Sequence, residues 1–151
     1  MPDASKVPPF FPAAFSFKVN VVGISGTYEG NFQEVTGINA KLGSEPVKEG
    51  GENRFEHRLP NPPKYENLVL KRGMVLSSGL ITWVRSAIEN FEITTKTVVV
   101  NLLDENKTPL ASWSFKNAYP VAYKISDLKA QDNAIVFETL ELSYSYFIRI
   151  N

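Results

Sequence analysis

Alternation of apolar and polar positions predicts strands in the first half of the chain. The run Phe15–Val21 places an aromatic or β-branched residue at every second position, which is the period of a half-buried strand. Residues 31–38, 38–42 and 67–75 show similar strand-like runs bounded by glycine or polar residues. Four short strands therefore lie ahead of any helical pattern, which indicates a mainly β fold.

Only one segment, about residues 78–90, shows the spacing of an amphipathic helix. Ser77 or Ser78 is a candidate cap for its first free N–H groups. One side carries apolar residues at the i, i+3, i+4 and i+7 spacing of a buried stripe: Leu80, Trp83, Val84, Ala87, Ile88 and Phe91. One helix of this length cannot cover a β core on both faces, so we expect it to flank the sheets.

The second half of the chain returns to the strand pattern. Residues 96–103 and 110–115 predict a hairpin in which Trp113 and Phe115 share one face. Residues 117–133 show a mixed pattern that suggests turns around a short strand or a helical turn. Ala134–Ile150 lacks Gly and Pro and alternates almost throughout, with Leu140 and Leu142 on the apolar face. Because such a strand would reach about 50 Å, either a bulge bends it between two sheets or part of it pairs outside its own subunit.

One segment fits neither pattern. Residues 43–66 hold several proline and glycine residues and only a short strand-like run, although most connections in compact domains are about 4 to 6 residues long. We therefore expect a long extended loop that becomes ordered against another molecule, as an inter-subunit arm. The rest of the 151 residues fits one domain, preceded by a proline-rich segment at residues 1–14.

The composition excludes several classes of function. The chain carries 16 Lys and Arg against 16 Asp and Glu, and it has no Cys. A neutral charge lacks the basic excess of a dedicated nucleic-acid binder, and the lack of cysteine excludes disulfides and thiolate chemistry. The first residues lack the regions of a signal peptide, and no apolar stretch approaches the about 20 residues that span a bilayer. We therefore expect synthesis in the cytoplasm.

Candidate catalytic chemistry is scarce. The chain contains no phosphate-binding, dinucleotide-binding, nucleophile-elbow or zinc-protease motif. A triad would have to use His57, the single His, which lies in a charged run between prolines and is better interpreted as an exposed arm residue. Carboxylate pairs such as Asp104 with Glu105 fit solvated turns, and Asp127 or Asp132 lack the spacing of a calcium loop. We expect no enzyme activity, metal or cofactor.

Candidate interface residues lie in the arm and at the end of one strand. The segment from Glu49 to Glu52 combines two acids with Gly50 and Gly51, whose backbone adopts positive φ readily. Lys71 and Arg72 place two cations at a strand end, where the arm acids are possible partners; a solvated strand end and an ordinary loop are the alternative interpretations. The subunit-interface candidates are Glu49, Gly50, Gly51, Glu52, Arg54, Lys71 and Arg72.

In their order and spacing, these segments resemble the inner tail-tube proteins of contractile phages and phage-tail-like injection particles, which are similar in fold to the type VI secretion tube. The resemblance covers residue 15 onward and is carried by Asn31–Ile38, Glu49–Gly51, Leu59–Pro60, Lys64–Gly73, Leu80 with Trp83, Trp113 with Phe115, Ala118–Pro120 and Glu138–Leu142. It implies a small β-barrel or sandwich of two packed antiparallel sheets with one flanking helix.

The resemblance also implies a function. Such proteins form hexameric rings that stack into a hollow tube, a passive conduit inside a contracting sheath that carries DNA or protein cargo. The implied partners are other copies of the chain, a sheath protein, baseplate or spike proteins and tube-terminating proteins, within a virion or an injection particle. Alternatives are a tube-initiating paralogue near the baseplate and a small-molecule or glycan-binding β-barrel that uses tyrosines 119, 123, 144 and 146.

Overall fold

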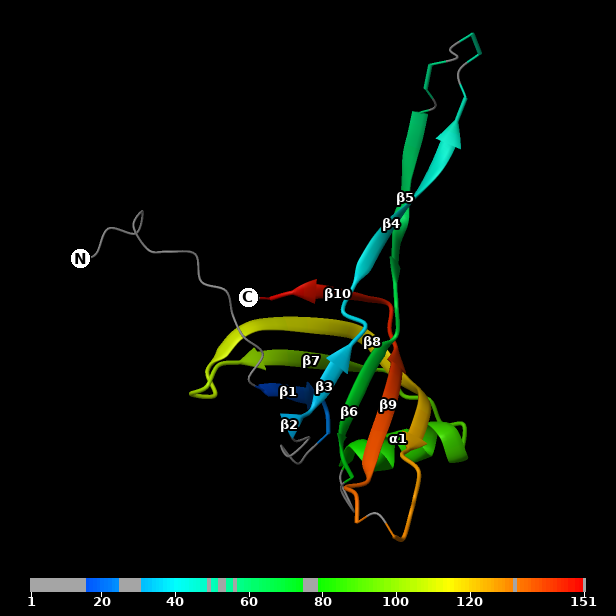
Figure 1. Cartoon of the computed structure of the whole chain (residues 1–151). Helices are drawn as coiled ribbons and strands as arrows, with labels where there is room; N and C mark the ends of the chain where they lie inside the picture. The colour runs from blue at the N-terminus through cyan, green and yellow to red at the C-terminus, as the bar shows by residue number, and fades with distance from the viewer. Residues whose placement is uncertain are drawn as a thin grey trace, which may run out of the picture.

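The computed structural model describes residues 16–24, 31–48, 50–51, 54–55, 57–74, 79–131 and 133–150. It contains ten strands and one helix in this part of the chain. In chain order they are β1 (Ser16–Val21), β2 (Asn31–Phe32), β3 (Glu34–Thr36), β4 (Ala40–Val47), β5 (His57–Tyr65), β6 (Leu68–Gly73), α1 (Gly79–Glu89), β7 (Lys96–Leu103), β8 (Pro109–Ile125), β9 (Phe137–Ser143) and β10 (Tyr146–Arg149). The predicted mainly β fold with one flanking helix is confirmed (Figure 1).

The body of the molecule consists of two antiparallel sheets joined through β8. Strands β2, β1, β7, β8 and β10 form the first sheet, and β8, β9, β6 and β3 form the second. The amino-terminal half of β8 pairs with β7 and β10, whereas its carboxyl half pairs with β9. These described strands form two sheets rather than a closed barrel.

The long strand β8 corrects one prediction from the sequence. Of the predicted turns around a short strand or helical turn, a strand is found at residues 117–125, where it continues β8 to a total length of 17 residues, and the turn predicted at Pro120 is wrong. Asn117 has a φ of 56°, and Asn tolerates this left-handed conformation better than most residues. It lies where β8 stops pairing with the first sheet and begins to pair with the second, so a single residue bends the strand without ending it.

The last apolar run is also divided. It forms β9, breaks at Tyr144 and Ser145, and resumes as β10 beside β8 in the first sheet. Of the two alternatives for this run, the bend between sheets is confirmed. The Ser145 N–H donates to the Lys116 carbonyl at 2.9 Å, which fixes the crossing point.

The core lies between the sheets and against α1. It combines aliphatic residues of β1, β6, β7 and β9 with Phe115 of β8, which is fully buried. The helix contributes Leu80, Trp83 and Val84, and the Trp83 indole N–H donates to the Thr94 carbonyl at 2.8 Å. This helix, predicted at about 78–90, is not long and apolar enough to cross a membrane, and the described residues contain no other.

The predicted apolar stripe of the helix is right over its first two turns and wrong at its end. Leu80, Trp83, Val84 and Ala87 are buried. Ile88 is half exposed and Phe91, beyond the last helical residue, is 83% exposed. The helix ends before the stripe does because Phe91 adopts a left-handed φ of 53°, which turns the chain away from the core.

The segment predicted as an extended loop at residues 43–66 is an antiparallel hairpin. Strands β4 and β5 pair with each other from Ala40–Tyr65 to Val47–His57 and with no other described strand. We call β4, β5 and the tip that joins them the arm; it projects away from the body (Figure 1). The proline-rich residues 1–14 lie outside the described residues.

Candidate assembly surfaces

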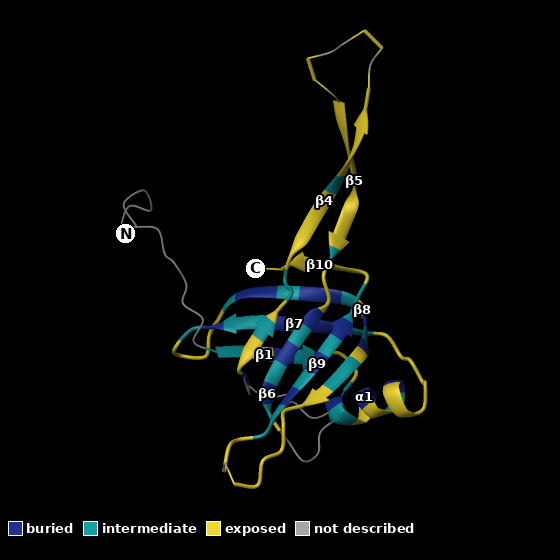
Figure 2. Ribbon diagram, turned by 45° about the vertical axis from the view of Figure 1, so that its right-hand side comes forward, coloured by how far each residue is buried: buried dark blue, intermediate teal, exposed yellow. Residues whose placement is uncertain are grey.

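The arm is exposed along almost its whole length. In β4 only Gly43 is less than exposed, and in β5 only Tyr65 at the root, which Figure 2 shows as a yellow ribbon beside a largely blue and teal body. Prolines at 46, 60, 62 and 63 are tolerated because each strand of a two-stranded ribbon is an edge, where a missing N–H costs least. The arm therefore buries no core of its own.

Aromatic residues hold the root of the arm to the body. The ring of Tyr65 lies 5.8 Å from that of Tyr144 and 5.3 Å from that of Phe147. Tyr144 in turn makes an edge contact with the buried Phe115 at 4.9 Å. The Asn39 side-chain amide also donates to Glu66 at 2.8 Å. These contacts fix where the arm leaves the body.

Tyr144 carries a buried hydroxyl for which no hydrogen-bond partner is found among the described residues. Burial raises its pKa to about 12, with smaller contributions in the same direction from Tyr65 and Glu66. Burying a hydroxyl without a hydrogen-bond partner costs free energy relative to leaving it in water. The aromatic packing at the root of the arm must therefore offset the desolvation of the Tyr144 hydroxyl.

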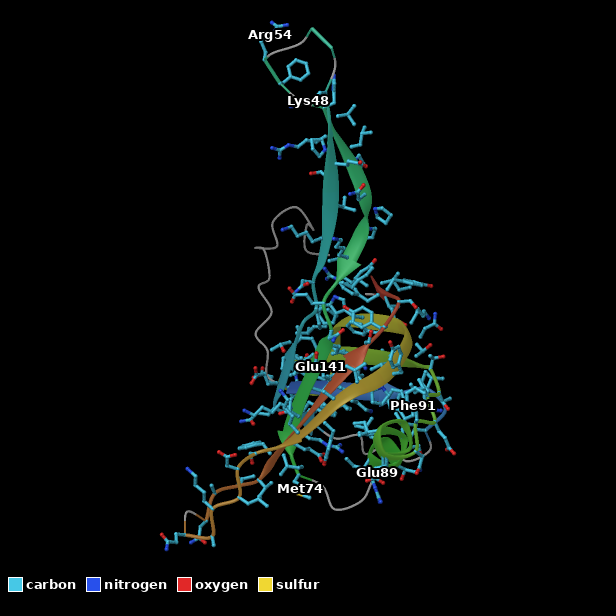
Figure 3. The ribbon with its side chains drawn as sticks, turned by 90° about the vertical axis from the view of Figure 1, so that its right-hand side faces the viewer. Lys48, Arg54, Met74, Glu89, Phe91 and Glu141 are labelled. Atoms are coloured by element: carbon cyan, nitrogen blue, oxygen red, sulfur yellow. The ribbon has the colours of Figure 1, made fainter. Side chains whose placement is uncertain are left out.

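The sequence-predicted interface residues fall in two separate places. Gly50, Gly51 and Arg54 lie at the exposed tip of the arm, where Gly51 has a φ of 90° that favours glycine (Figure 3). Lys71 and Arg72 lie in the body on β6. Glu49 and Glu52 lie outside the described residues. The structure thus does not bring the tip and the strand-end cations together within one subunit.

Arg72 has its partner inside the subunit. It is 3% exposed, and its Nε donates to Glu138 Oε1 at 2.5 Å. The Tyr123 hydroxyl donates to the other oxygen of Glu138 at 2.8 Å, and the Arg72 guanidinium lies 5.1 Å from the centre of the Phe32 ring. Burial, followed by this bond to Glu138, raises the pKa of Tyr123 to about 12.

This network was missed by sequence reasoning, although the strand period contained the signal. Arg72 falls on the same face of β6 as the buried Leu68 and Leu70, and Glu138 on the same face of β9 as the buried Leu140. Charged residues on two buried rows indicate an internal ion pair. Lys71, the residue before Arg72, is half-buried, and its ammonium lies 5.1 Å from the centre of the Phe137 ring. It lies opposite Glu34 on β3.

A second surface is the outward face of the first sheet. The strand registers place mostly polar residues of four strands on this side, which we call the polar face. Its residues are Lys18, Asn20, Val99, Asn101, Ser112, Ser114, Lys116, Tyr146 and Ile148. Its two charged residues are Lys18 and Lys116. The Ser112 hydroxyl donates a hydrogen bond to the Asn101 side-chain oxygen at 2.6 Å. The two serine side chains are buried, at 6% and 3% exposure, so the accessible part of the face combines lysine and asparagine side chains with Tyr146 and Ile148 and includes no carboxylate.

The residues considered for catalysis or metal binding either stabilise a turn or lie exposed, away from other candidate residues. His57 lies exposed in the arm, with its ring 5.1 Å from that of Phe55. Asp104 accepts the N–H groups of Asn106 and Thr108 at 2.8 Å and closes the β7–β8 turn. Within the described ranges no group of His, Cys, Asp and Glu is arranged to hold a metal ion; Asp132 lies outside them.

The tyrosines considered for a small-molecule site do not converge. Tyr123 is bonded to Glu138, Tyr144 belongs to the aromatic contacts at the arm root, and Tyr146 is on the polar face. Tyr119 lies opposite Ser143 in the second sheet. Three cavities found among the described residues are lined by none of these four side chains.

Solved structures of other proteins share this architecture. In the anti-feeding prophage baseplate, solved with sixfold symmetry, one chain is 27% identical, with a TM-score of 0.81 over 96% of this chain and 97% of that one. A chain of the PVC sheath–tube complex in its extended state is 21% identical, with a TM-score of 0.77 over 99% and 98%.

More distant similarity reaches Hcp1 from Flavobacterium johnsoniae, with 16% identity and a TM-score of 0.53 over 89% of this chain and 94% of that one. No curated protein matches the chain. The family described as T4-like virus tail tube protein gp19 matches residues 13–148. The chain belongs to this tail-tube family, as the resemblance in its sequence predicted.

Proposed function

We propose that this chain forms hexameric rings that stack into the inner tube of a contractile tail or injection particle. The arm is the observation that carries the proposal. It is a long hairpin with both strands exposed, and an isolated two-stranded hairpin is marginally stable in water. A neighbouring copy of the chain supplies the contact surface that the arm lacks.

In this proposal the polar face lines the channel. A conduit needs a wall that water wets and that passing cargo does not bind tightly, and the lysine and asparagine side chains of the face, together with Tyr146, supply polar groups for that wall. The free edges of the first sheet pair between subunits when the ring closes, which removes a template for aggregation. The whole chain then acts as one tube domain, with residues 1–14 and 43–66 reaching neighbouring subunits.

The tube works passively and this chain makes or breaks no bond. A surrounding sheath contracts, the rigid tube is driven into a target cell, and DNA or protein passes along the channel. The chain is assembled in the bacterial cytoplasm with sheath, baseplate or spike, and terminating proteins. A tube-initiating role near the baseplate is the second candidate, favoured by the 27% identity to a chain of a baseplate structure.

Electron microscopy of the purified protein tests the proposal. Stacked rings are expected from the wild-type chain, whereas single rings that never stack would favour the initiator. A variant that lacks residues 45–56 keeps the root pairs Ala40–Tyr65 and Ser44–Pro60 and should remain a folded subunit that does not stack. A wild-type protein that stays monomeric at high concentration, or a shortened variant that stacks normally, contradicts the proposal.

A further inference from the structure

Two groups of exposed apolar side chains lie at opposite ends of the molecule, apart from those near the end of α1 and along β10. One group, Leu42, Val47, Phe55 and Leu59, lies on the arm. The other, Met74, Ile125, Leu128 and Ile135, lies where β6 and β8 end and β9 begins, far from the arm (Figures 1 and 3). Leu128 and Ile135 are 76% and 72% exposed. Exposed apolar groups at such a density mark contact surfaces.

The second end is hollowed. The connection between β8 and β9, which we call the distal loop, is described over residues 126–131 and 133–136, and it borders a partly open cavity of about 360 Å³ lined by Asp127, Leu128, Lys129, Ala130, Ala134 and Val136. Its stem is fixed because the Ser126 N–H donates to the Phe137 carbonyl at 2.9 Å, and the Phe137 N–H donates to the Ser126 hydroxyl at 3.0 Å. Four of the six lining residues are apolar, with Asp127 and Lys129 beside them, and since a cavity of about 150 Å³ is large enough for benzene, the volume here is sufficient for an aromatic ring.

The size of the arm shows why its tip needs an anchor. Strand β4 has eight residues, so the paired ribbon is about 27 Å long and about 10 Å wide. One face of it offers on the order of 270 Å², whereas a stable interface buries about 800 Å² on each partner. Contacts along the flat ribbon are therefore too small by themselves, and an aromatic side chain in a cavity is the usual form of an energetic anchor.

We propose that Phe55 at the arm tip of one copy inserts into the distal-loop cavity of a second copy. This inference rests on the proposed stacking and names the contact that performs it. Because tip and cavity lie at opposite ends of the same chain, the contact is head-to-tail, and a contact of this kind repeats without closing when it runs along one axis. Every copy except those at the ends of the stack then has both surfaces covered.

Directed disulfide formation tests the contact, since the chain has no Cys. Arg54→Cys lies beside Phe55 and leaves that anchor intact, and Lys129→Cys lies on the cavity. The two single variants are mixed, stacked under reducing conditions, imaged and then oxidised. A crosslinked pair should form at least tenfold more than when Lys129→Cys is replaced by Glu105→Cys, an exposed site in the β7–β8 turn. Adding Phe55→Ser to Arg54→Cys should remove the excess.

The outcomes separate this inference from the function on which it rests. Stacks that form but give no excess of the mixed crosslink, or that give mainly tip-to-tip pairs of Arg54→Cys, overturn the Phe55 contact and leave the tube intact. Failure of the wild-type chain to form rings or stacks overturns the proposed function itself. If Arg54→Cys prevents stacking, Lys48→Cys, directly after β4 at the arm tip (Figure 3), takes its place with the same criteria.

Discussion

The arm and the body use the same antiparallel pairing but differ in what covers it. In the body, β6 and β9 alternate strictly between buried and half-buried residues. In the arm, β4 and β5 pair over a similar length and are exposed on both sides. Hydrogen bonds between strands contribute little net free energy when water can replace them, so burial distinguishes the two regions. The body is built on its own core, whereas the arm buries none, and in the proposed function a neighbouring copy covers it.

The same substitution in the two regions should give the largest difference. Leu140→Asp places a carboxylate at a position that is 4% exposed, which removes apolar burial and adds an unpaired buried charge. The expected loss exceeds about 5 kcal/mol and unfolds the subunit. Leu42→Asp on the arm, 64% exposed, should change stability by less than about 0.5 kcal/mol. Circular dichroism and urea unfolding measure both; a folded Leu140→Asp variant would show that β9 presents its other face to the core.

How far the sequence predicted each region follows from this difference. Body strands such as β1 and β9 bury one face and leave the other more exposed, so alternating apolar and polar residues in the sequence correspond directly to the two faces. The arm has no inside, and its prolines and glycines therefore predicted a loop although the chain pairs as a hairpin. Predictions also failed where one residue redirects the chain: Asn117 continues β8 through an expected turn, and Phe91 ends α1 before its apolar stripe does.

The candidate interface was predictable in part for the same reason. Gly50, Gly51 and Arg54 were selected by composition, which identifies an exposed tip. Arg72 was selected because it adjoins Lys71 at a strand end, but neighbouring residues of a strand point to opposite faces. The two-residue period places Arg72 inside, and only the fold supplies Glu138 as its partner. Charge combined with strand parity therefore indicates whether a residue is exposed or buried better than charge on its own.

Breaking the internal ion pair should give the next largest effect. Glu138→Gln leaves the Arg72 charge buried without its partner, which costs about 3 to 5 kcal/mol. Glu89→Gln is the matched control because the Arg85–Glu89 pair joins exposed side chains, 67% and 54% accessible, at 3.1 Å. That loss should be about 0.3 to 0.5 kcal/mol. Urea unfolding of both variants measures the contrast, and equal losses would mean that the Arg72–Glu138 pair is hydrated in solution.

Alkaline pH should weaken the body and leave the contribution of the arm unchanged. The pKa of Tyr123 is raised to about 12 in the folded chain, against about 10 when unfolded. The folded state therefore holds the proton more tightly, and this stabilisation is complete below pH 10 and is lost as the pH rises through 12. Unfolding free energies measured between pH 9 and 12 should fall more steeply for the wild type than for Tyr123→Phe.

Tyr144, with its pKa raised in the same direction, preserves part of that slope in the Tyr123→Phe variant. The variant without residues 45–56 keeps both tyrosines and should follow the wild-type curve across this range. A flatter curve for the shortened variant would mean that the arm contributes to the folding of the subunit, against the division drawn between arm and body. An unchanged slope in Tyr123→Phe would place the alkaline sensitivity elsewhere.

The smallest effect concerns Phe91, an exposed apolar residue of the body. A left-handed φ of 53° costs a bulky residue about 1 to 2 kcal/mol, and Gly adopts this conformation without that strain. After the entropy that Gly loses on folding, Phe91→Gly should stabilise the subunit by about 0.5 to 1 kcal/mol. Ile93→Gly, nearby and also exposed, relieves no such strain and should destabilise by a similar amount. Thermal unfolding gives the two signs. Opposite signs would mean that Phe91 lowers the stability of the isolated subunit, and that a contact outside the subunit accounts for this residue, as proposed for the arm. Equal signs would limit such outside contacts to the arm.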